Sequence, residues 1–232
     1  SMSTNFYPKK QGLYDPFFEH DSCGVGFICH MKGHKTHKMV RDGIKILENL
    51  NHRGATGSDP LTGDGAGILV QMPDKFFRKE CAKLNIDLPC EGDYGVGMTF
   101  LPRNLESRNT IQEWIERAVR QEGQVFLGWR DVPIDPEKIG PVARSGMPIF
   151  RQIFIGRGEK TPRERFELKL YVIRKSLFNK IEESILREKR SFYFCSLSAK
   201  TIVYKGQLLA DQVDSFFTDL ADPDFETGLA MV

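Results

Sequence analysis

Apolar residues recur along this chain in two spacings, and segments with the helical spacing alternate with segments that look extended. Apolar positions three and four residues apart predict helices over 36–50 and 76–84, and a third that includes 111–119. A fourth helix is expected from Thr161 onward, and a short fifth helix over 207–217.

The extended segments are short and rich in β-branched and aromatic residues, which is typical of strands. The predicted strands are 24–29, 68–72, 94–102, 124–129, 148–155, 191–198 and 200–206, the last two as a pair. Residues 227–232 begin a further strand that has no room to finish, so the chain looks cut. No internal repeat or low-complexity linker interrupts the pattern, and we predict one α+β domain.

The fourth helix has the most complete sequence signal. Thr161 can cap it, Pro162 suits its first turn, and Glu164 completes a capping box. The side chains that the helical spacing assigns to buried faces are Val40, Ile44 and Leu47 in the first helix, Ile111, Trp114, Ile115, Ala118 and Val119 in the third, and Phe166, Leu170, Ile173, Leu177 and Ile181 in the fourth.

Composition narrows the possible functions. The chain has 232 residues, of which 40% are hydrophobic, enough for one large core. Its net charge is +2 and its basic residues are spread, so nucleic-acid binding is not indicated. No apolar run could span a membrane or form a signal-peptide core. Ser1 and Met2 look like the remnant of a cleaved tag.

The five cysteines form no C-x-x-C pair, so neither a disulfide framework nor a zinc ribbon is implied. Free thiols in a reducing cytoplasm are expected. Cys29, His30, His34 and His37 stand close together, but Gly33 breaks any helix there, and solvated histidines are favoured over a metal site.

Cys23 stands at the mouth of the first predicted strand, in "DSCGVG". It can be a buried structural cysteine, since free cysteines are often buried. It can also be an N-terminal nucleophile, because Gly24 and Gly26 allow close approach and Ser22 is small. In that design the chain breaks before Cys23, and the freed α-amine, with a reference pKa of about 8, is the base for its own thiol.

Two loop motifs are also candidates for ligand binding. In "HRGATG", Arg53 and Gly54 can be an ordinary helix end, or Arg53 can hold a carboxylate if the loop folds back on Cys23. The "TGDGAG" stretch over 62–67 suggests a phosphate loop, and hence a nucleotide-binding protein. Its glycines precede a strand and lack the P-loop spacing, so a tight turn is favoured.

The stretch "DSCGVGFI…NLNHRGATGSDPLTGDGAGILVQMP" resembles the amino-terminal glutaminase domains of the glutamate synthase family. The similarity continues in order through "GWRDVPID", "IFRQIFIGR", "FELKLYVIRK" and "SLSAKTIVYKGQLL". These domains are class II glutamine amidotransferases of the N-terminal nucleophile type. The resemblance implies a four-layer αββα sandwich, a leader over 1–22 and an amidotransferase domain over 23–232.

The resemblance also implies a chemistry. Cleavage between Ser22 and Cys23 exposes Cys23, which takes the γ-glutamyl group of L-glutamine as a thioester and releases ammonia. Arg53 and Gly54 match the family's "HRG" element beside the nucleophile. No cofactor is expected in this chain. In the parent enzyme, ammonia passes to 2-oxoglutarate in synthase domains with FMN and an iron–sulfur cluster, served in some members by a small electron-donating subunit.

The family's pattern continues beyond Val232 with an arginine that grips the substrate carboxylate and an Asn-Gly pair that builds the oxyanion hole. Since those residues are absent here and the leader still precedes Cys23, we expect this stretch alone to be inactive. A non-catalytic, partner-binding module with the same fold is the alternative.

Overall fold

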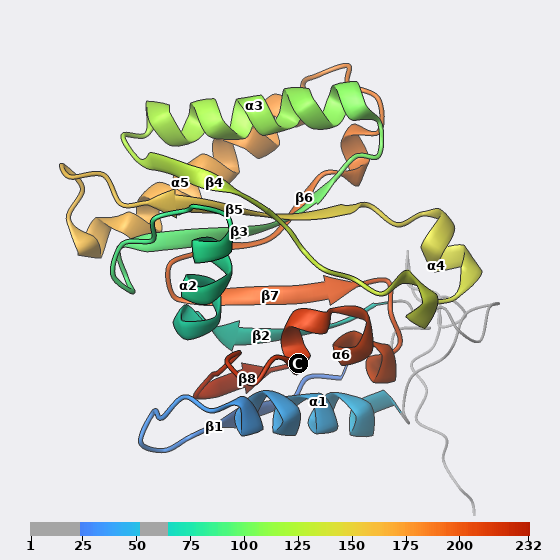
Figure 1. Ribbon diagram of the computed structural model, residues 1–232. Helices are drawn as coiled ribbons and strands as arrows, with labels where there is room; N and C mark the ends of the chain where they lie inside the picture. The colour runs from blue at the N-terminus through green and yellow to red at the C-terminus, as the bar shows by residue number, and fades with distance from the viewer. Residues whose placement is uncertain (1–23, 52–64) are drawn as a thin grey trace, which may run out of the picture.

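The computed structural model describes residues 24–51 and 65–232, and the structural statements below concern these residues. Strands and helices alternate along the chain, largely as the apolar pattern predicts (Figure 1). The α-helices and β-strands are β1 (Phe27–Cys29), α1 (His37–Asn51), β2 (Ala66–Gln71), α2 (Asp74–Lys83), β3 (Tyr94–Leu101), α3 (Leu105–Gln121), β4 (Val125–Asp131), α4 (Pro141–Ser145), β5 (Ile149–Gly156), α5 (Arg163–Glu182), β6 (Tyr193–Ser198), β7 (Thr201–Gly206), α6 (Val213–Phe216) and β8 (Leu229–Met231).

The described strands form two antiparallel sheets, with the orders β1-β8-β2-β7 and β4-β5-β3-β6. Figure 1 shows α3 and α5 over the second sheet and α1 beside β8 and β1 of the first. The mixed α and β class is therefore confirmed in its coarse form. Residues 227–232, expected to begin a strand, contain β8, which lies between β1 and β2.

The helices confirm most of the predicted buried faces. Val40, Ile44 and Leu47 of α1 are buried, and so is the whole predicted stripe of α5. In α3 the predicted face is buried except for Trp114, which is only partly covered. The short helix expected over 207–217 is narrower than predicted, because α6 begins at Val213 after a 3-10 turn.

The predicted capping box of α5 is wrong. The N-cap position is Pro162, and no side chain caps the helix there. The Thr161 hydroxyl instead accepts a hydrogen bond of 2.9 Å from the Gln124 side-chain amide, which lies just before β4. The Thr161 hydroxyl therefore bonds to a residue of a distant segment and does not cap its own helix.

The predicted pairing of β6 with β7 is also wrong, because β6 pairs with β3 and β7 pairs with β2. Serine side chains connect the two strands instead. The backbone N–H of Val203 donates to Ser196 Oγ at 3.0 Å, and that of Thr201 donates to Ser198 Oγ at 3.2 Å. The turn between β6 and β7 thus carries the chain from one sheet to the other.

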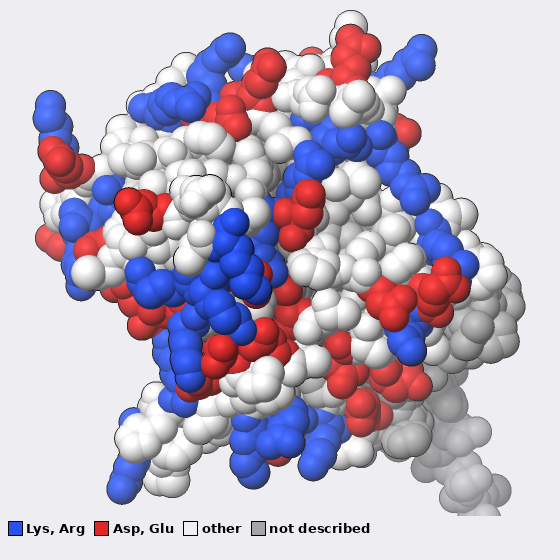
Figure 2. All heavy atoms as spheres, viewed as in Figure 1, with Lys and Arg blue, Asp and Glu red and all other residues white. Residues whose placement is uncertain are grey.

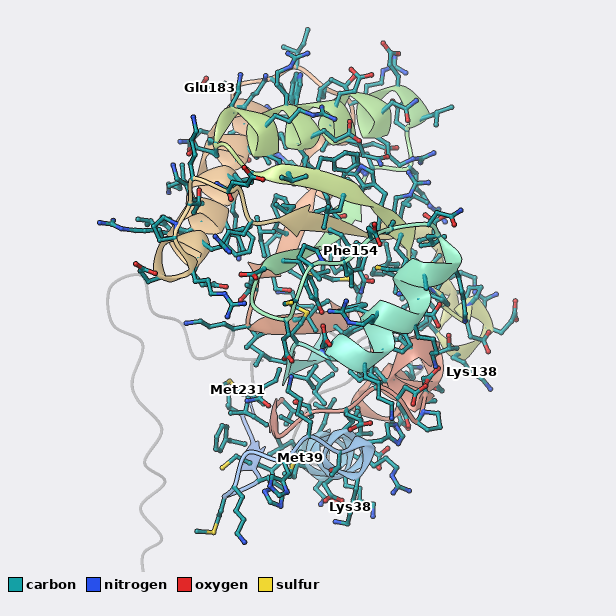
Figure 3. The ribbon with its side chains drawn as sticks, turned by 60° about the vertical axis from the view of Figure 1, so that its left-hand side comes forward. Lys38, Met39, Lys138, Phe154, Glu183 and Met231 are labelled. Carbon is teal, nitrogen blue, oxygen red and sulfur yellow. The ribbon has the colours of Figure 1, made fainter. Side chains whose placement is uncertain are left out.

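Alternate residues of β5 face two hydrophobic clusters. Phe154 belongs to the larger cluster, which contains residues of both sheets and of α1 and α2. Ile153 and Ile155 belong to the smaller cluster under α3 and α5. Figure 3 shows Phe154 in the interior, whereas Lys38 and Glu183 point outward at opposite ends of the molecule.

A buried polar network crosses the larger cluster, and the sequence carried no signal for it. Arg130 of β4 donates to both carboxylate oxygens of Asp219 at 2.7 and 2.9 Å. Tyr204 of β7 donates to the same carboxylate at 2.8 Å, and Gln152 of β5 bonds to both Arg130 and Tyr204. The four side chains therefore join the two sheets through bonds that leave no charge unpaired.

Charges of both signs lie close together over the face seen in Figure 2. This mixture agrees with the small net charge of +2. Within residues 24–51 and 65–232, no helix combines the length and the apolar character that a bilayer crossing needs.

Candidate active site

Ser22, Cys23, Arg53 and Gly54, the residues that the sequence assigns to the site, lie outside the described residues. The structure describes the chain directly after Cys23, from Gly24 onward, and the helix that ends directly before the "HRG" motif. The site can therefore be located by the elements to which its residues are joined.

The chain after Cys23 enters the first sheet at its edge. Gly26 exchanges two backbone hydrogen bonds with Val232, at 3.1 and 2.9 Å, and Phe27 then begins β1. The strand predicted over 24–29 is thus shorter than expected, although its pairing extends back to Gly26. These bonds fix the backbone three residues after the predicted nucleophile.

The last turns of α1 pack directly on this segment. A Cβ atom added to Gly24 would lie 3.3 Å from Cβ of Leu50, and one added to Gly26 would overlap the Cγ2 methyl of Ile46. Cys23 is bonded to Gly24, and α1 ends at Asn51, one residue before the "HRG" motif. The two segments predicted to form the site therefore leave the described structure at the same corner.

The start of β2 lies at the same end of the sheet. Phe27 and Leu69 both pair with Met231 of β8, so β1 and β2 run in the same direction. Gly24 and Ala66, each three residues earlier, consequently lie at one end of the sheet. The segment 52–64 connects α1 with β2, and both of its attachment points are at this end.

A small open pocket lies at the end of β7, beside Gly206. Since Gly206 pairs with Ala66, the pocket borders the same end of the sheet. Its walls include Ala143, Leu208 and Phe216, and none of the described lining residues is charged. The pocket can therefore accept apolar groups, but it offers no ionic partner for the carboxylate or amine of an amino acid.

Two of the described thiols are poor nucleophiles. Burial raises the pKa of Cys81 to about 12 and that of Cys195 to about 12, so both remain protonated at neutral pH. Cys29 and Cys90 are exposed. All four are free, and in the described part of the chain they belong to no group of three or more potential metal ligands.

The structure also describes the histidine cluster and part of the glycine-rich stretch that the sequence singled out. The rings of His30 and His34 stack at 5.0 Å, while His37 Nε2 lies 2.9 Å from the Leu220 carbonyl oxygen. Of the "TGDGAG" stretch only 65–67 is described, and it leads into β2 without opening a helix. That geometry differs from a phosphate loop, where the backbone N–H groups point from a helix start.

Sequence reasoning missed the residues of α1 that contact the site segment, Ile46 and Leu50. Gly43 was the available signal, because glycine in a helix interior usually has a packing reason. A Cβ atom on Gly43 would lie 2.7 Å from Cβ of Ala230, so the glycine allows α1 to approach β8.

The chain is similar to known proteins over most of its length. Residues 23–232 match the model of the class II glutamine amidotransferases. The chain is 51% identical to the glutamate synthase (NADPH) large chain of Bacillus subtilis over 232 residues, all of this chain and 15% of that protein.

Two more distant relatives have names with other electron donors. The chain is 38% identical to glutamate synthase (NADH) of Schizosaccharomyces pombe, over 97% of this chain and 11% of the relative. It is 33% identical to ferredoxin-dependent glutamate synthase 2 of Synechocystis sp., over 92% of this chain and 13% of the relative. The chain thus spans between 11 and 15% of the length of these three relatives.

Proposed function

The chain belongs to the class II glutamine amidotransferases, and from this premise we propose that residues 23–232 are part of the glutaminase unit of a glutamate synthase. The observation that carries the proposal is the start of the family match at Cys23, the residue that the sequence favours as an N-terminal nucleophile. Residues 1–22 then form a leader that is removed before catalysis.

The relatives support a role that does not depend on the electron donor. Their names specify NADPH, NADH and ferredoxin, yet all of them share this stretch of sequence. A region common to synthases with different donors suits the step that needs no electrons, the release of ammonia from glutamine. The ammonia then passes to 2-oxoglutarate in synthase domains that carry FMN and an iron–sulfur cluster.

The described cysteines lie apart from one another. Cys29, Cys81, Cys90 and Cys195 form no thiolate set for a cluster within the described ranges. Their free state is typical of a reducing compartment, and we propose a cytoplasmic location. We also propose a small electron-donating subunit as a partner of the synthase domains.

The proposed reaction proceeds in two steps on Cys23. The thiolate sulfur attacks the side-chain amide carbon of L-glutamine, the C–N bond breaks, and the freed α-amine relays the thiol proton to the departing ammonia. Water then attacks the γ-glutamyl thioester, the C–S bond breaks, and glutamate leaves with the thiol restored. Arg53, a planar cation that suits carboxylates, holds the substrate or the mature terminus together with Gly54.

Cleavage of the bond between Ser22 and Cys23 is necessary in this scheme. While the leader remains, the Cys23 nitrogen is an amide and cannot accept a proton at neutral pH. We therefore propose that the uncleaved chain releases no ammonia. For the fold, the two antiparallel sheets with helices against them are compatible with the αββα layers of N-terminal nucleophile enzymes.

Intact-mass analysis of the parent glutamate synthase that contains this chain tests the function. We expect the loss of residues 1–22, followed by stoichiometric labelling at Cys23 by a glutamine-like chloroketone. A Cys23→Ser variant should lose the label, whereas Cys90→Ser, which removes an exposed thiol, should keep it. Retention of the leader in active protein, or equal labelling of Cys90 and Cys23, would contradict the proposal.

A further inference from the structure

The helix α5 carries large apolar side chains on two opposite sides. The stripe that begins at Phe166 and ends at Ile181 is buried under the helix, against β5 and α3. Leu168, Tyr171 and Phe178 share the opposite side, because their spacings are close to whole helical turns. They are 50%, 60% and 56% exposed. A helix that is apolar on all sides is typical of one that is covered on all sides.

The outward sides of α1 and α3 are polar, as expected for helices on a protein surface. Over 37–50 of α1, the exposed residues are Lys38, Arg41, Lys45 and Asn49. In α3, after its first residue, the exposed residues are Glu106, Asn109, Glu113, Arg117, Arg120 and Gln121. Single exposed apolar residues are ordinary, but several on one side of a helix form a patch, and such patches mark interaction sites.

A lysine stands inside the patch on α5. Lys175 lies one helical turn after Tyr171 and about one turn before Phe178, so it shares their side of the helix. Lys169, beside the patch, is paired with Glu122 at 3.4 Å, whereas Lys175 makes no ion pair with any described residue. We call the three exposed apolar residues and Lys175 the outer face of α5. A surface that complements this face is apolar and supplies a carboxylate.

A second copy of this chain is a poor partner for the outer face. Most closed dimers are two-fold symmetric, so the residue at the centre of the contact meets its own counterpart. Lys175 lies between Tyr171 and Phe178, and two unpaired ammonium groups would repel each other there. Three side chains also cover only part of the roughly 800 Å² that each partner contributes to a stable interface.

Another domain of the same polypeptide is a better partner. The relative from Bacillus subtilis is 51% identical over all of this chain, but the chain covers only 15% of that protein. A domain on the same polypeptide is held at a high effective concentration, so a small contact is sufficient for docking. Contacts between domains are also more polar than those of obligate dimers, which suits a patch that contains a lysine.

We propose that the outer face of α5 docks against another domain of the parent polypeptide, through an apolar surface with a carboxylate opposite Lys175. This inference rests on the proposed function, which makes that polypeptide a synthase with further domains. In the docked state Leu168, Tyr171 and Phe178 lose their exposure, and α5 is covered on both sides.

Cysteine accessibility in the parent synthase tests the docking. Leu168→Cys should be alkylated about tenfold or more slowly than Leu84→Cys, each rate being divided by that of the same variant unfolded in urea. Leu84 follows α2 and is the matched control, since it is also a leucine and is 47% exposed. Glu113→Cys, on the polar side of α3, should react as fast as Leu84→Cys. Equal rates at all three positions would overturn the proposal.

Charge reversal tests the carboxylate. In the Leu168→Cys protein, Lys175→Glu should raise the alkylation rate about fivefold or more, because two carboxylates would then face each other. Lys175→Arg keeps the positive charge and should keep the protection. Full protection in the Lys175→Glu variant would overturn the assigned complementarity.

Photo-cross-linking identifies what covers the helix. A benzophenone maleimide is attached to the Leu168→Cys variant of the parent synthase, and the cross-linked peptides are identified by mass spectrometry. We expect peptides of the same polypeptide from outside 1–232. Cross-links confined to 1–232, or a covalent dimer of the parent chain on a denaturing gel, would overturn the proposal.

The two proposals fail in different ways, because none of these measurements depends on Cys23. Rapid alkylation of Leu168→Cys in a synthase whose Cys23 reacts with the chloroketone would overturn the docking alone. Absence of labelling at Cys23 would instead reject the glutaminase function, whatever covers α5.

Discussion

Arg130 and Asp219 bring two opposite charges into the interior, where their side chains are 5% and 4% exposed. Burial alone would lower the pKa of Arg130, but the hydrogen bonds and charge of Asp219 outweigh it and raise the pKa. Tyr204 and Gln152 complete the bonding of the pair. Such a pair tolerates burial only while every member is present.

Removal of one member should therefore be far more damaging than loss of a surface ion pair. We expect Asp219→Ala to lower the free energy of unfolding by about 3–5 kcal/mol. The buried Arg130 charge loses its two short carboxylate bonds and keeps only Glu80, 3.9 Å away, as an acidic partner. Urea titration followed by circular dichroism measures the change.

Lys38 and Asp42 provide the surface comparison, since they form an ion pair at 2.7 Å with Lys38 72% exposed. Asp42→Ala should lower the free energy of unfolding by less than about 1 kcal/mol. If Asp219→Ala and Asp42→Ala had similar effects, water would have to reach Arg130, and the buried network would not hold the sheets together as described.

At the scale of elements, hydrophobic periodicity predicted which faces of the helices are buried. It did not predict contacts between segments that are distant in the sequence. The faces of α1 and α5 were predictable because their apolar residues recur every three or four positions. The cap of α5 was not, because Thr161 bonds to Gln124 of a distant segment. The partners of β6 were not either, because alternation marks a strand without identifying its neighbour.

The candidate site was likewise predictable only in part from the sequence. The motifs around Cys23 and Arg53 were visible in the sequence, and their roles stay predictions, since both residues lie outside the described ranges. The contact of Gly26 with Ile46 was not visible, because it joins a strand edge to a helix face through side chains with no shared period.

Asp93 shows how charged groups connect three elements, and it carries a pH-dependent prediction. Its carboxylate accepts hydrogen bonds from Arg163, at the start of α5, and from Arg157, after β5, while Asp93 itself precedes β3. Arg163 first, and then Arg157, lower the pKa of Asp93 from 3.8 to about 2. The stabilisation is therefore present above pH 3.8 and is lost as the pH falls through about 2.

Asp93→Asn should consequently unfold at lower urea than the wild type at neutral pH, and the difference should shrink between pH 3.8 and about pH 2. Urea midpoints measured across this range test the sign. Asp87→Asn is the control, since Asp87 is exposed and makes no ion pair with any described residue. A difference between wild type and Asp93→Asn that grew on acidification would contradict the assigned contacts.

At the scale of the molecule, the two hydrophobic clusters share the sheet β4-β5-β3-β6 as their common wall. Phe154 and Val96 face the larger cluster, while Ile153 and Ile155 face the smaller one. If either cluster loses its packing, one face of these shared strands is uncovered and the sheet loses support for the other cluster. The chain also crosses between the sheets at the β6–β7 turn, so the sheets are joined by bonds as well as by packing.

This shared wall predicts a single unfolding transition, and the chain carries natural probes for both clusters. Trp114 and Trp129, the two tryptophans of the chain, pack against the smaller cluster, whereas Cys81 is fully buried in the larger one. Tryptophan fluorescence and the alkylation of Cys81, quantified by peptide mass spectrometry, should have the same urea midpoint. Exposed Cys90 should be alkylated at every urea concentration and corrects for reagent reactivity. If fluorescence changed at lower urea than Cys81 alkylation, α3 and α5 would be separating from a core that stays folded, and the sheet would not couple the two clusters.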